Sequence, residues 1–248
     1  MKENIQWVDS CRSTNTLMKE TAAGLPHGSV IAAREQSAGR GQRGNSWEAQ
    51  PGKNLTFSLL LRPSELKASE QFFMSEAVAL GIVDALREIM PGKDNITIKW
   101  PNDIYVDNKK ICGILIENSL SGTLISRSIA GIGININQRE FLSDAPNPVS
   151  VINLTGIEHN LEDVLESVLN HIAMRWELMT SDRDRLHSDY FSSLYARNGL
   201  RYRDAASQEE FHATILAIAP SGHITLMDDD MNRRTYAFKE VTAIIPDN

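Results

Sequence analysis

The residues best suited to chemistry in this chain of 248 residues lie in a basic, glycine-rich stretch at positions 36–47. It reads Gln-Ser-Ala-Gly-Arg-Gly-Gln-Arg-Gly-Asn-Ser-Trp, so three glycines free the backbone while Arg40 and Arg43 keep positive charge beside it. This composition suits a loop that closes over an anion. A mobile surface loop without a ligand is the alternative that the stretch alone leaves open.

The same stretch contains the pattern G-x-G-x-x-G from Gly39 to Gly44, which marks dinucleotide binding when a helix follows it. Residues 45–53 contain two turn formers and have no helical period. The mechanism of that motif needs a helix N-terminus under the pyrophosphate. The pattern therefore does not predict a dinucleotide fold here.

Two stretches near the middle of the chain combine lysine with turn or strand signals. In Lys99-Trp-Pro-Asn-Asp the proline ends a strand, so Asn102 and Asp103 project from the strand end, unless the stretch is only a turn. Lys110 begins the apolar strand Lys-Ile-Cys-Gly-Ile-Leu-Ile-Glu. Its ammonium either faces water or lies at the core edge, where it would make sense beside an anionic ligand.

Two further stretches carry glycines or hydroxyl and amide groups. Gly131-Ile-Gly-Ile-Asn places glycines inside a strand, which a bulge or the close approach of a ligand would explain. Asn135 would face the same side of that strand as Gly131 and Gly133. Ser13, Thr14 and Asn15 can each cap the helix that follows. Three such side chains exceed the need of one helix end, so one of them is a candidate for binding a polar ligand.

The composition indicates an ordinary folded protein and excludes several classes. A net charge of −7 and a pI near 5.4 argue against nucleic-acid binding, because that needs a basic face.

Cys11 and Cys112 are far apart, so no disulfide framework is predicted, and the scattered histidines predict no metal site. Asp228-Asp-Asp is interpreted as a hairpin turn rather than a cation site. The sequence shows no signal peptide and no run of 18 apolar residues, which predicts a cytoplasmic protein without membrane contact.

The elements that must position these residues predict an α+β fold. The predicted strands are residues 5–8, 29–35 and 54–62. The predicted helices are residues 69–90, from their helical spacing, about 160–181, which a capping box at 160–163 opens, and 183–197. Residues 96–137 indicate successive strands, which implies antiparallel pairing. After Gly199, four or five short strands predict a small barrel of SH3-like size. The predicted domains are therefore residues 1–198 and 199–248.

Taken together, these motifs resemble the biotin protein ligase family. Its members carry G-R-G-x-x-G, K-W-P-N-D, K-x-x-G-I-L-x-E and G-x-G-x-N in this order, and an S-T-N near the start that Ser13-Thr-Asn matches. The resemblance runs from about residue 5 to the end of the chain, including the small C-terminal barrel. Family members that regulate transcription carry an N-terminal helix-turn-helix domain, and this chain starts almost at the first catalytic strand, so we expect no DNA binding.

The resemblance implies a fold shared with class II aminoacyl-tRNA synthetase cores, in a mixed but largely antiparallel sheet followed by the SH3-like barrel. It implies that biotin and Mg-ATP give biotinyl-5'-AMP and pyrophosphate, after which a lysine of a biotin carboxyl carrier protein domain, part of a biotin-dependent carboxylase, takes the biotinyl group. Catalytic roles fall on Lys110, Arg40 and Arg43. The implied biotin contacts are Ser13, Thr14, Asn15, Gln36, Gly39, Arg40, Gly41, Gln42, Lys110 and Gly113. The implied contacts to ATP and the adenylate are Arg40, Arg43, Trp47, Lys99, Asn102 and Asn135.

Some points depart from the family pattern or stay open. Many members have further arginines where this chain has Gln42 and Asn45, and Cys112 stands where a small residue is expected, as a core neighbour of the site. A lipoate or octanoyl ligase or transferase of the same fold is the rival enzyme, and a non-catalytic biotin-binding module is the rival of another class. The chain is expected to be a monomer or a homodimer.

Overall fold

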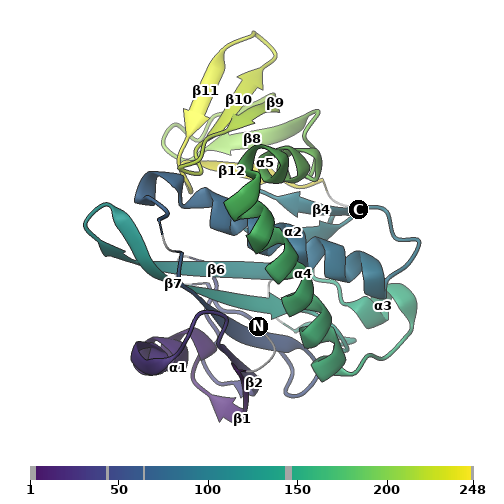
Figure 1. The fold of residues 1–248 in the computed structure, drawn as a ribbon. Coiled ribbons are helices and arrows are strands. Elements are labelled where there is room, and N and C mark those ends of the chain that lie inside the picture. Colours follow the sequence, from purple (N-terminus) through teal and green to yellow (C-terminus); the bar gives the residue numbers. More distant parts are fainter. Residues whose placement is uncertain (1–3, 43–44, 64, 143–146, 247–248) are drawn as a thin grey trace.

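A computed structural model describes residues 4–42, 45–63, 65–142 and 147–246, and its centre is a seven-stranded sheet (Figure 1). The strand order is β1-β2-β3-β7-β6-β5-β4. The prediction of antiparallel strands over 96–137 is confirmed, whereas β1 and β2 pair in parallel because helix α1 crosses between them. The strands are β1 (Ile5–Cys11), β2 (Val30–Gln36), β3 (Leu55–Leu61), β4 (Ile96–Lys99), β5 (Asp103–Val106), β6 (Lys109–Ser121) and β7 (Leu124–Ile134).

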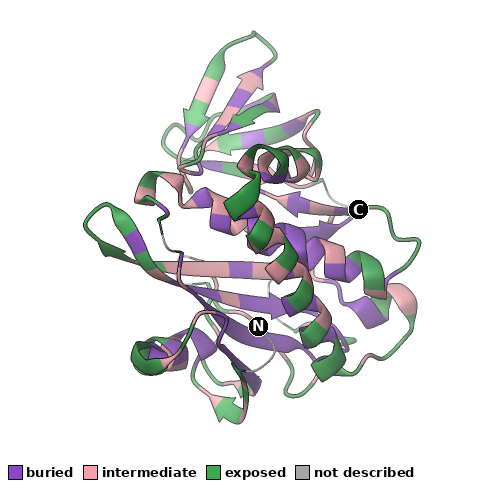
Figure 2. Cartoon of the chain, viewed as in Figure 1, coloured by how far each residue is buried: buried purple, intermediate pink, exposed green. Residues whose placement is uncertain are grey.

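Helices cover both faces of this sheet, and side-chain alternation along β3 shows why. Leu59 and Leu61 belong to the large core under α2 (Phe72–Ile89) and α4 (Leu161–Ser181), whereas Leu60 packs with Met18 of α1 (Thr14–Thr21). Figure 1 shows α2 and α4 lying across the front of the sheet and α1 apart from them. Figure 2 shows that the sheet strands beneath these helices are largely buried. The α1 face is the less covered one.

The predicted helices form, with differences at their ends. Asn160 caps α4 as predicted, because its side chain accepts hydrogen bonds from the next turn. The predicted helix over 183–197 is wrong beyond α5 (Arg183–Ser192), since Ser193 and Tyr195 instead hydrogen-bond to Ile98 of β4. The short helix α3 (Val151–Thr155) and the 3-10 turns η2 (Ala22–Gly24) and η4 (Ala68–Glu70) were not predicted.

The C-terminal residues form a second, antiparallel sheet of five strands in the order β11-β10-β9-β8-β12. The short strands predicted there are confirmed, and residues 229–230 form the turn between β10 and β11. Among the described residues the edge strands β11 and β12 do not pair with each other, so the sheet is open rather than a closed barrel. The strands are β8 (Leu200–Asp204), β9 (Glu210–Ile218), β10 (Ile224–Asp228), β11 (Arg233–Tyr236) and β12 (Val241–Ile244).

The second sheet docks on the turn that follows β4. The indole Nε1 of Trp100 donates to the carbonyl oxygen of Gly222 at 3.0 Å, and the ring of Phe238 lies 5.4 Å from Trp100 and 5.9 Å from Phe72. Residues of both sheets share one hydrophobic core. The C-terminal sheet therefore supports the segment that carries Asn102 and Asp103.

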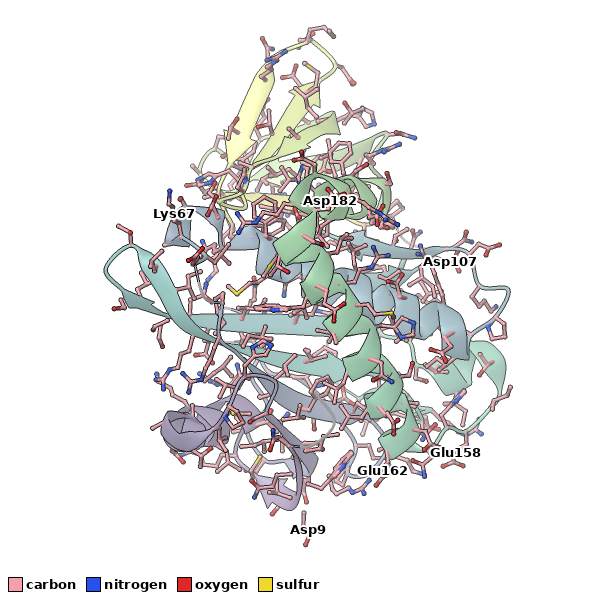
Figure 3. The ribbon with its side chains drawn as sticks, in the orientation of Figure 1. Asp9, Lys67, Asp107, Glu158, Glu162 and Asp182 are labelled. Atoms are coloured by element: carbon pink, nitrogen blue, oxygen red, sulfur yellow. The ribbon has the colours of Figure 1, made fainter. Side chains whose placement is uncertain are left out.

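Several acidic side chains lie on the outside of the molecule. Figure 3 shows Asp9, Glu158 and Glu162 at the lower edge of the view, pointing outward, and Asp107 at the side. The net charge of −7 is therefore compatible with a basic loop at an internal site.

Candidate active site

A cavity on the α1 face of the large sheet collects most of the predicted site residues. It holds about 50 Å³ and lies over the cross-strand neighbours Gly113 of β6 and Gly133 of β7. Its lining comes from the start of α1, the end of β2, the glycine-rich loop, the turn before β5, and β6. The predicted residues that line it are Ser13, Thr14, Asn15, Gln36, Arg40, Gly41, Gln42, Trp47, Asn102, Lys110 and Gly113.

The cavity floor is built from glycines because side chains press directly on the strands. A Cβ atom at Gly131 would lie 2.3 Å from Asn15 Oδ1, and one at Gly133 would lie 2.3 Å from Trp47 Cε2. At Gly113 a Cβ atom would lie 2.9 Å from Trp47 Cζ3. The Trp47 Nε1 is buried without a hydrogen-bond partner among the described residues. The strand glycines thus reflect close approach, and the indole N–H is a free donor.

One end of the cavity is lined by neutral hydrogen-bonding groups. The Thr14 amide donates to Gln36 Oε1 at 2.8 Å, and Ser58 Oγ lies 2.8 Å from Thr14 Oγ1 and 2.6 Å from Asn15 Oδ1. Ser13 occupies the N-cap position of α1, but its side chain makes no capping hydrogen bond although it is buried. This end can therefore match a small polar group with several donors and acceptors.

Glu117 of β6 joins the two ends of the cavity. Its Oε2 accepts from Asn15 Nδ2 at 2.8 Å and from Arg40 Nη2 at 2.9 Å. The guanidinium of Arg40 is thereby held at the mouth, where its side chain stays partly exposed. A charge-assisted pair of this kind fixes geometry more than it stabilises the fold.

The glycine-rich loop folds back on itself. The Gly41 amide donates to the Asn45 carbonyl at 2.7 Å, and the Trp47 amide donates to the Gly39 carbonyl at 3.0 Å. No helix follows the loop over residues 45–54, which agrees with the prediction that the glycine pattern is not a dinucleotide motif. Arg43 lies outside the described residues. Gly39 does not line the cavity, but a Cβ atom there would lie 2.8 Å from the Trp47 carbonyl oxygen.

A β-bulge aims Lys110 at the cavity. Tyr105 of β5 pairs with Lys110 and the preceding Ile104 pairs with Cys112, so Ile111 is the extra residue. Residues 110 and 113 would face opposite sides of a regular strand, whereas here a Cβ atom at Gly113 would lie 3.4 Å from Lys110 Cε.

The ammonium of Lys110 has one carboxylate partner and one aromatic neighbour. Its Nζ lies 2.8 Å from Asp103 Oδ1 and 5.7 Å from the centre of the Trp47 ring. The two charged side chains are 26% and 15% exposed, so the pair is partly desolvated. Of the two interpretations of Lys110, the structure supports a charge at the core edge rather than one pointing into water.

A larger cavity of about 830 Å³ adjoins the first and extends to the C-terminal sheet. The predicted residues Lys99 and Asn135 line this second cavity and not the first. Burial lowers the pKa of Lys99. Asn135 Nδ2 donates to the Val149 carbonyl at 3.1 Å, while its Oδ1 is buried without a partner among the described residues. The Asn135 oxygen thus has capacity for a further polar partner.

Sequence reasoning missed two residues of the site. Glu117 ends the quoted strand motif, and a carboxylate in an otherwise apolar strand was the signal available for it. Ser58 gave no signal, because its partners on α1 lie more than forty positions away. Cys112 is fully buried, as expected for a core neighbour, and burial raises the pKa of its thiol.

The described part of the chain shows neither a metal-binding cluster nor a membrane-spanning helix. No group of three or more His, Cys, Asp or Glu residues there is arranged to hold a metal ion. No helix there is long and apolar enough to cross a membrane.

Comparison with known proteins gives concordant results. The model of the biotin/lipoate A/B protein ligase family matches residues 7–135. A biotin--[acetyl-CoA-carboxylase] ligase of Paracoccus denitrificans is 36% identical over 66% of this chain and 69% of its own length. The bifunctional ligase/repressor of Bacillus subtilis is 32% identical over 71% of this chain, which spans only 54% of that protein.

Solved structures give the same fold. The biotin protein ligase of Aquifex aeolicus in complex with biotin and ATP superposes with a TM-score of 0.80 at 25% identity, over 98% of this chain and all of that one. The biotin protein ligase of Leishmania major in complex with biotinyl-5-AMP superposes with a TM-score of 0.68 at 20% identity, over 96% of this chain and all of that one. From the family match and these likenesses, the chain belongs to the biotin/lipoate A/B protein ligase family, as an enzyme of the ligase class.

Proposed function

We propose that this protein is a biotin protein ligase that forms biotinyl-5'-AMP from biotin and ATP and transfers the biotinyl group to a lysine of a biotin carboxyl carrier protein domain. The observation that carries the proposal is the cavity over Gly113 and Gly133, which has a neutral hydrogen-bonding end and a basic end. Such a pocket fits a polar ring whose acid tail is activated by a nucleotide. The similarity to the ligases of Paracoccus denitrificans and Aquifex aeolicus supports it.

The neutral end suits the ureido ring of biotin. Ser13, Thr14, Asn15 and Gln36 offer hydroxyl and amide groups at the start of α1 and the end of β2, where a buried polar ring must find all its partners. Ile114 adds apolar surface for the rest of the ligand.

The basic end suits the reacting carboxylate and the phosphates. Lys110 would stabilise the negative charge that develops on the carboxylate and the α-phosphate, and would polarise the acyl group during transfer. Arg40, and Arg43 beyond the described residues, would bind phosphate oxygens as the loop orders over the adenylate. Closure excludes water and protects the mixed anhydride from hydrolysis.

The second cavity suits the rest of ATP. Lys99, Asn102 and Asn135 line it and would contact ribose and phosphates, and Trp47 would stack on the adenine. Magnesium would enter with ATP and keep mostly phosphate and water oxygens as ligands. The Asn135 Oδ1, which has no partner among the described residues, could act as a ligand to that ion or accept a hydrogen bond from a hydroxyl group. We also propose that residues 1–198 form the catalytic domain and residues 199–248 a second domain.

Pyrophosphate release tests the first step, and mass spectrometry tests the second. The enzyme should release pyrophosphate from ATP when biotin is present and add one biotinyl group to an isolated carrier domain. A protein that bound biotin without either reaction would be a binding module instead.

A lipoate or octanoyl ligase is the second candidate, because the matched family model covers both acids. The hydrogen-bonding end of the cavity favours biotin, since a lipoyl ring offers no N–H or carbonyl group to it. Pyrophosphate release with lipoate and not with biotin would reject our proposal.

A further inference from the structure

Three cavities meet at the site, and among the described residues only Gln42 and Asn102 line all three. The first is the small cavity over the glycine floor, and the second is the large one toward the C-terminal sheet. The third holds about 110 Å³ and lies between the start of α2, strand β6 and Phe238. A junction of three cavities could bring three substrates together, which in the proposed reaction are biotin, ATP and the carrier lysine.

The second cavity suits an anion and not an amine. Three lysines and two carboxylates line it, so its net charge is positive and favours phosphates over an ammonium group; these residues are Lys99, Lys110, Lys239, Glu48 and Asp103. A protein lysine would meet that unfavourable charge on its way to the junction.

The third cavity has the opposite character. The described residues that line it carry no charge. Apolar side chains, among them Phe72, Ile116 and Phe238, alternate there with uncharged polar ones such as Gln71 and Ser75. Its outer rim reaches solvent at the exposed Asn118, whose Nδ2 donates to Gln71 Oε1 at 3.0 Å. It is therefore a short uncharged passage, apolar in part, from the surface to the junction.

We infer that the third cavity admits the acceptor lysine of the carrier, an inference that rests on the proposed function. The four methylene groups would lie between its apolar side chains, and the amine would reach the junction beside Gln42 and Asn102. There the neutral nitrogen attacks the acyl carbon of the adenylate. A C–N bond forms, the bond from the acyl carbon to the phosphate oxygen breaks, AMP leaves with that electron pair, and one amine proton passes to solvent.

The surroundings of this passage favour the reactive form of the amine. Desolvation by the apolar side chains disfavours an ammonium ion, and the N-terminus of the 18-residue helix α2 disfavours positive charge nearby. Only the neutral amine is a nucleophile, so the passage would deliver the lysine already activated.

Narrowing the passage gives the first test. Ser75 of α2 lines the third cavity and neither of the others, so Ser75→Leu fills the passage and Ser75→Ala is its matched control. Three rates are measured: biotin-dependent pyrophosphate release, biotinylation of the carrier domain, and trapping of the adenylate by hydroxylamine, which has no side chain to seat. We expect Ser75→Leu to lower carrier biotinylation by about tenfold or more through misplacement of the amine. Pyrophosphate release and hydroxylamine trapping should stay near the wild-type and Ser75→Ala rates.

A charge at the rim gives a second test that does not depend on core packing. Gln71→Lys should raise the KM for the carrier, and added salt should weaken the effect, while the uncharged Gln71→Met should not show this salt dependence. Wild-type carrier transfer by Ser75→Leu, equal loss of hydroxylamine trapping in it, or no difference between the two Gln71 variants would overturn the inference. Failure of the proposed function would show separately, as wild-type enzyme that releases no pyrophosphate with biotin.

Discussion

The position of Lys110 depends on both a backbone irregularity and an ion pair. A bulge in β6 turns it toward the glycine floor, and Asp103 holds its ammonium at 2.8 Å. An ion pair that is 26% and 15% exposed is useful when an anion must be stabilised as it forms, because the lysine is already desolvated and oriented.

We expect Lys110→Ala to lose about a hundredfold or more of turnover while still binding biotin. Biotin binding should persist because the neutral hydrogen-bonding groups lie at the other end of the cavity. Single-turnover adenylation and calorimetric biotin titration measure the two quantities. Lys109→Ala is the control, since Lys109 is exposed on the same strand. Turnover of Lys110→Ala at the wild-type rate would remove Lys110 from the mechanism.

Arg40 stands at the cavity mouth, where Glu117 holds it. Arg40→Gly removes a cation that the closed loop would place on phosphate, so we expect the adenylate to escape and to label lysines of bystander proteins. Arg12→Gly, a change at an exposed neighbouring position, is the control. The measurement is mass spectrometry of a mixture of the carrier and an unrelated protein. Labelling confined to the carrier would show that Arg40 does not retain the intermediate.

At the scale of elements, the segment that follows the glycine-rich loop is held by hydrogen bonds to the side chain of Gln138. Gln138, which follows β7, is 2% exposed; its Oε1 accepts from the Gln50 amide at 2.9 Å and from Asn54 Nδ2 at 2.6 Å. Its Nε2 donates to Glu48 Oε1 at 3.1 Å. The segment after Trp47 is thus tied to the end of the strand that supplies the glycine floor.

Gln138→Met keeps the length of the side chain and removes these hydrogen bonds. The Nδ2 of the buried Asn54 would lose its acceptor, which should lower the free energy of unfolding by about 1 to 2 kcal/mol. The loosened loop should also shorten the lifetime of the bound adenylate, which a merely structural defect far from the loop would not do. Denaturant unfolding and adenylate-release kinetics test both, with the exposed Gln6→Met as control. An unchanged adenylate lifetime would limit Gln138 to a role in stability.

The elements themselves were largely predictable, because their signals are local. Helical spacing predicted α2, the side chain of Asn160 predicted the start of α4, and successive apolar runs predicted the antiparallel strands. The glycines of β7 indicated a close approach, but they could not indicate that Asn15 and Trp47 are the groups that approach. That information lies in contacts between residues far apart in the sequence.

Other features of the site were missed for the same reason. The bulge at Ile111 depends on pairing with β5, and the end of α5 depends on hydrogen bonds to Ile98 of β4. Glu117 is a site residue only because Asn15 and Arg40 converge on it. Local propensity does not determine these long-range pairings. The motifs of the site can therefore be recognised in the sequence, whereas the geometry of the site cannot.

At the scale of the whole molecule, α5 links the catalytic core to the C-terminal sheet. His187 of α5 hydrogen-bonds at 2.7 Å to Glu76 of α2, whose side chain is 1% exposed. The hydrogen bond to Glu76 raises the pKa of His187, and burial raises the pKa of Glu76. The contact of α5, which precedes the C-terminal sheet in the chain, with α2 of the core thus depends on protonation.

Both pKa shifts make the folded chain bind protons more tightly than the unfolded chain, so stability should decline as the pH rises. The contribution of His187 is complete below its ordinary pKa of 6.5 and is lost as the pH rises through its higher folded value, which leaves the buried carboxylate of Glu76 without a cation. We expect the Tm to fall by about a few degrees as the pH rises from 6.5 into the alkaline range. His187→Gln should flatten this dependence, whereas His171→Gln, whose partner Glu88 is largely exposed, should keep it. Differential scanning calorimetry across this pH range measures the slopes, and parallel slopes for wild type and His187→Gln would show that the α2–α5 contact does not respond to pH.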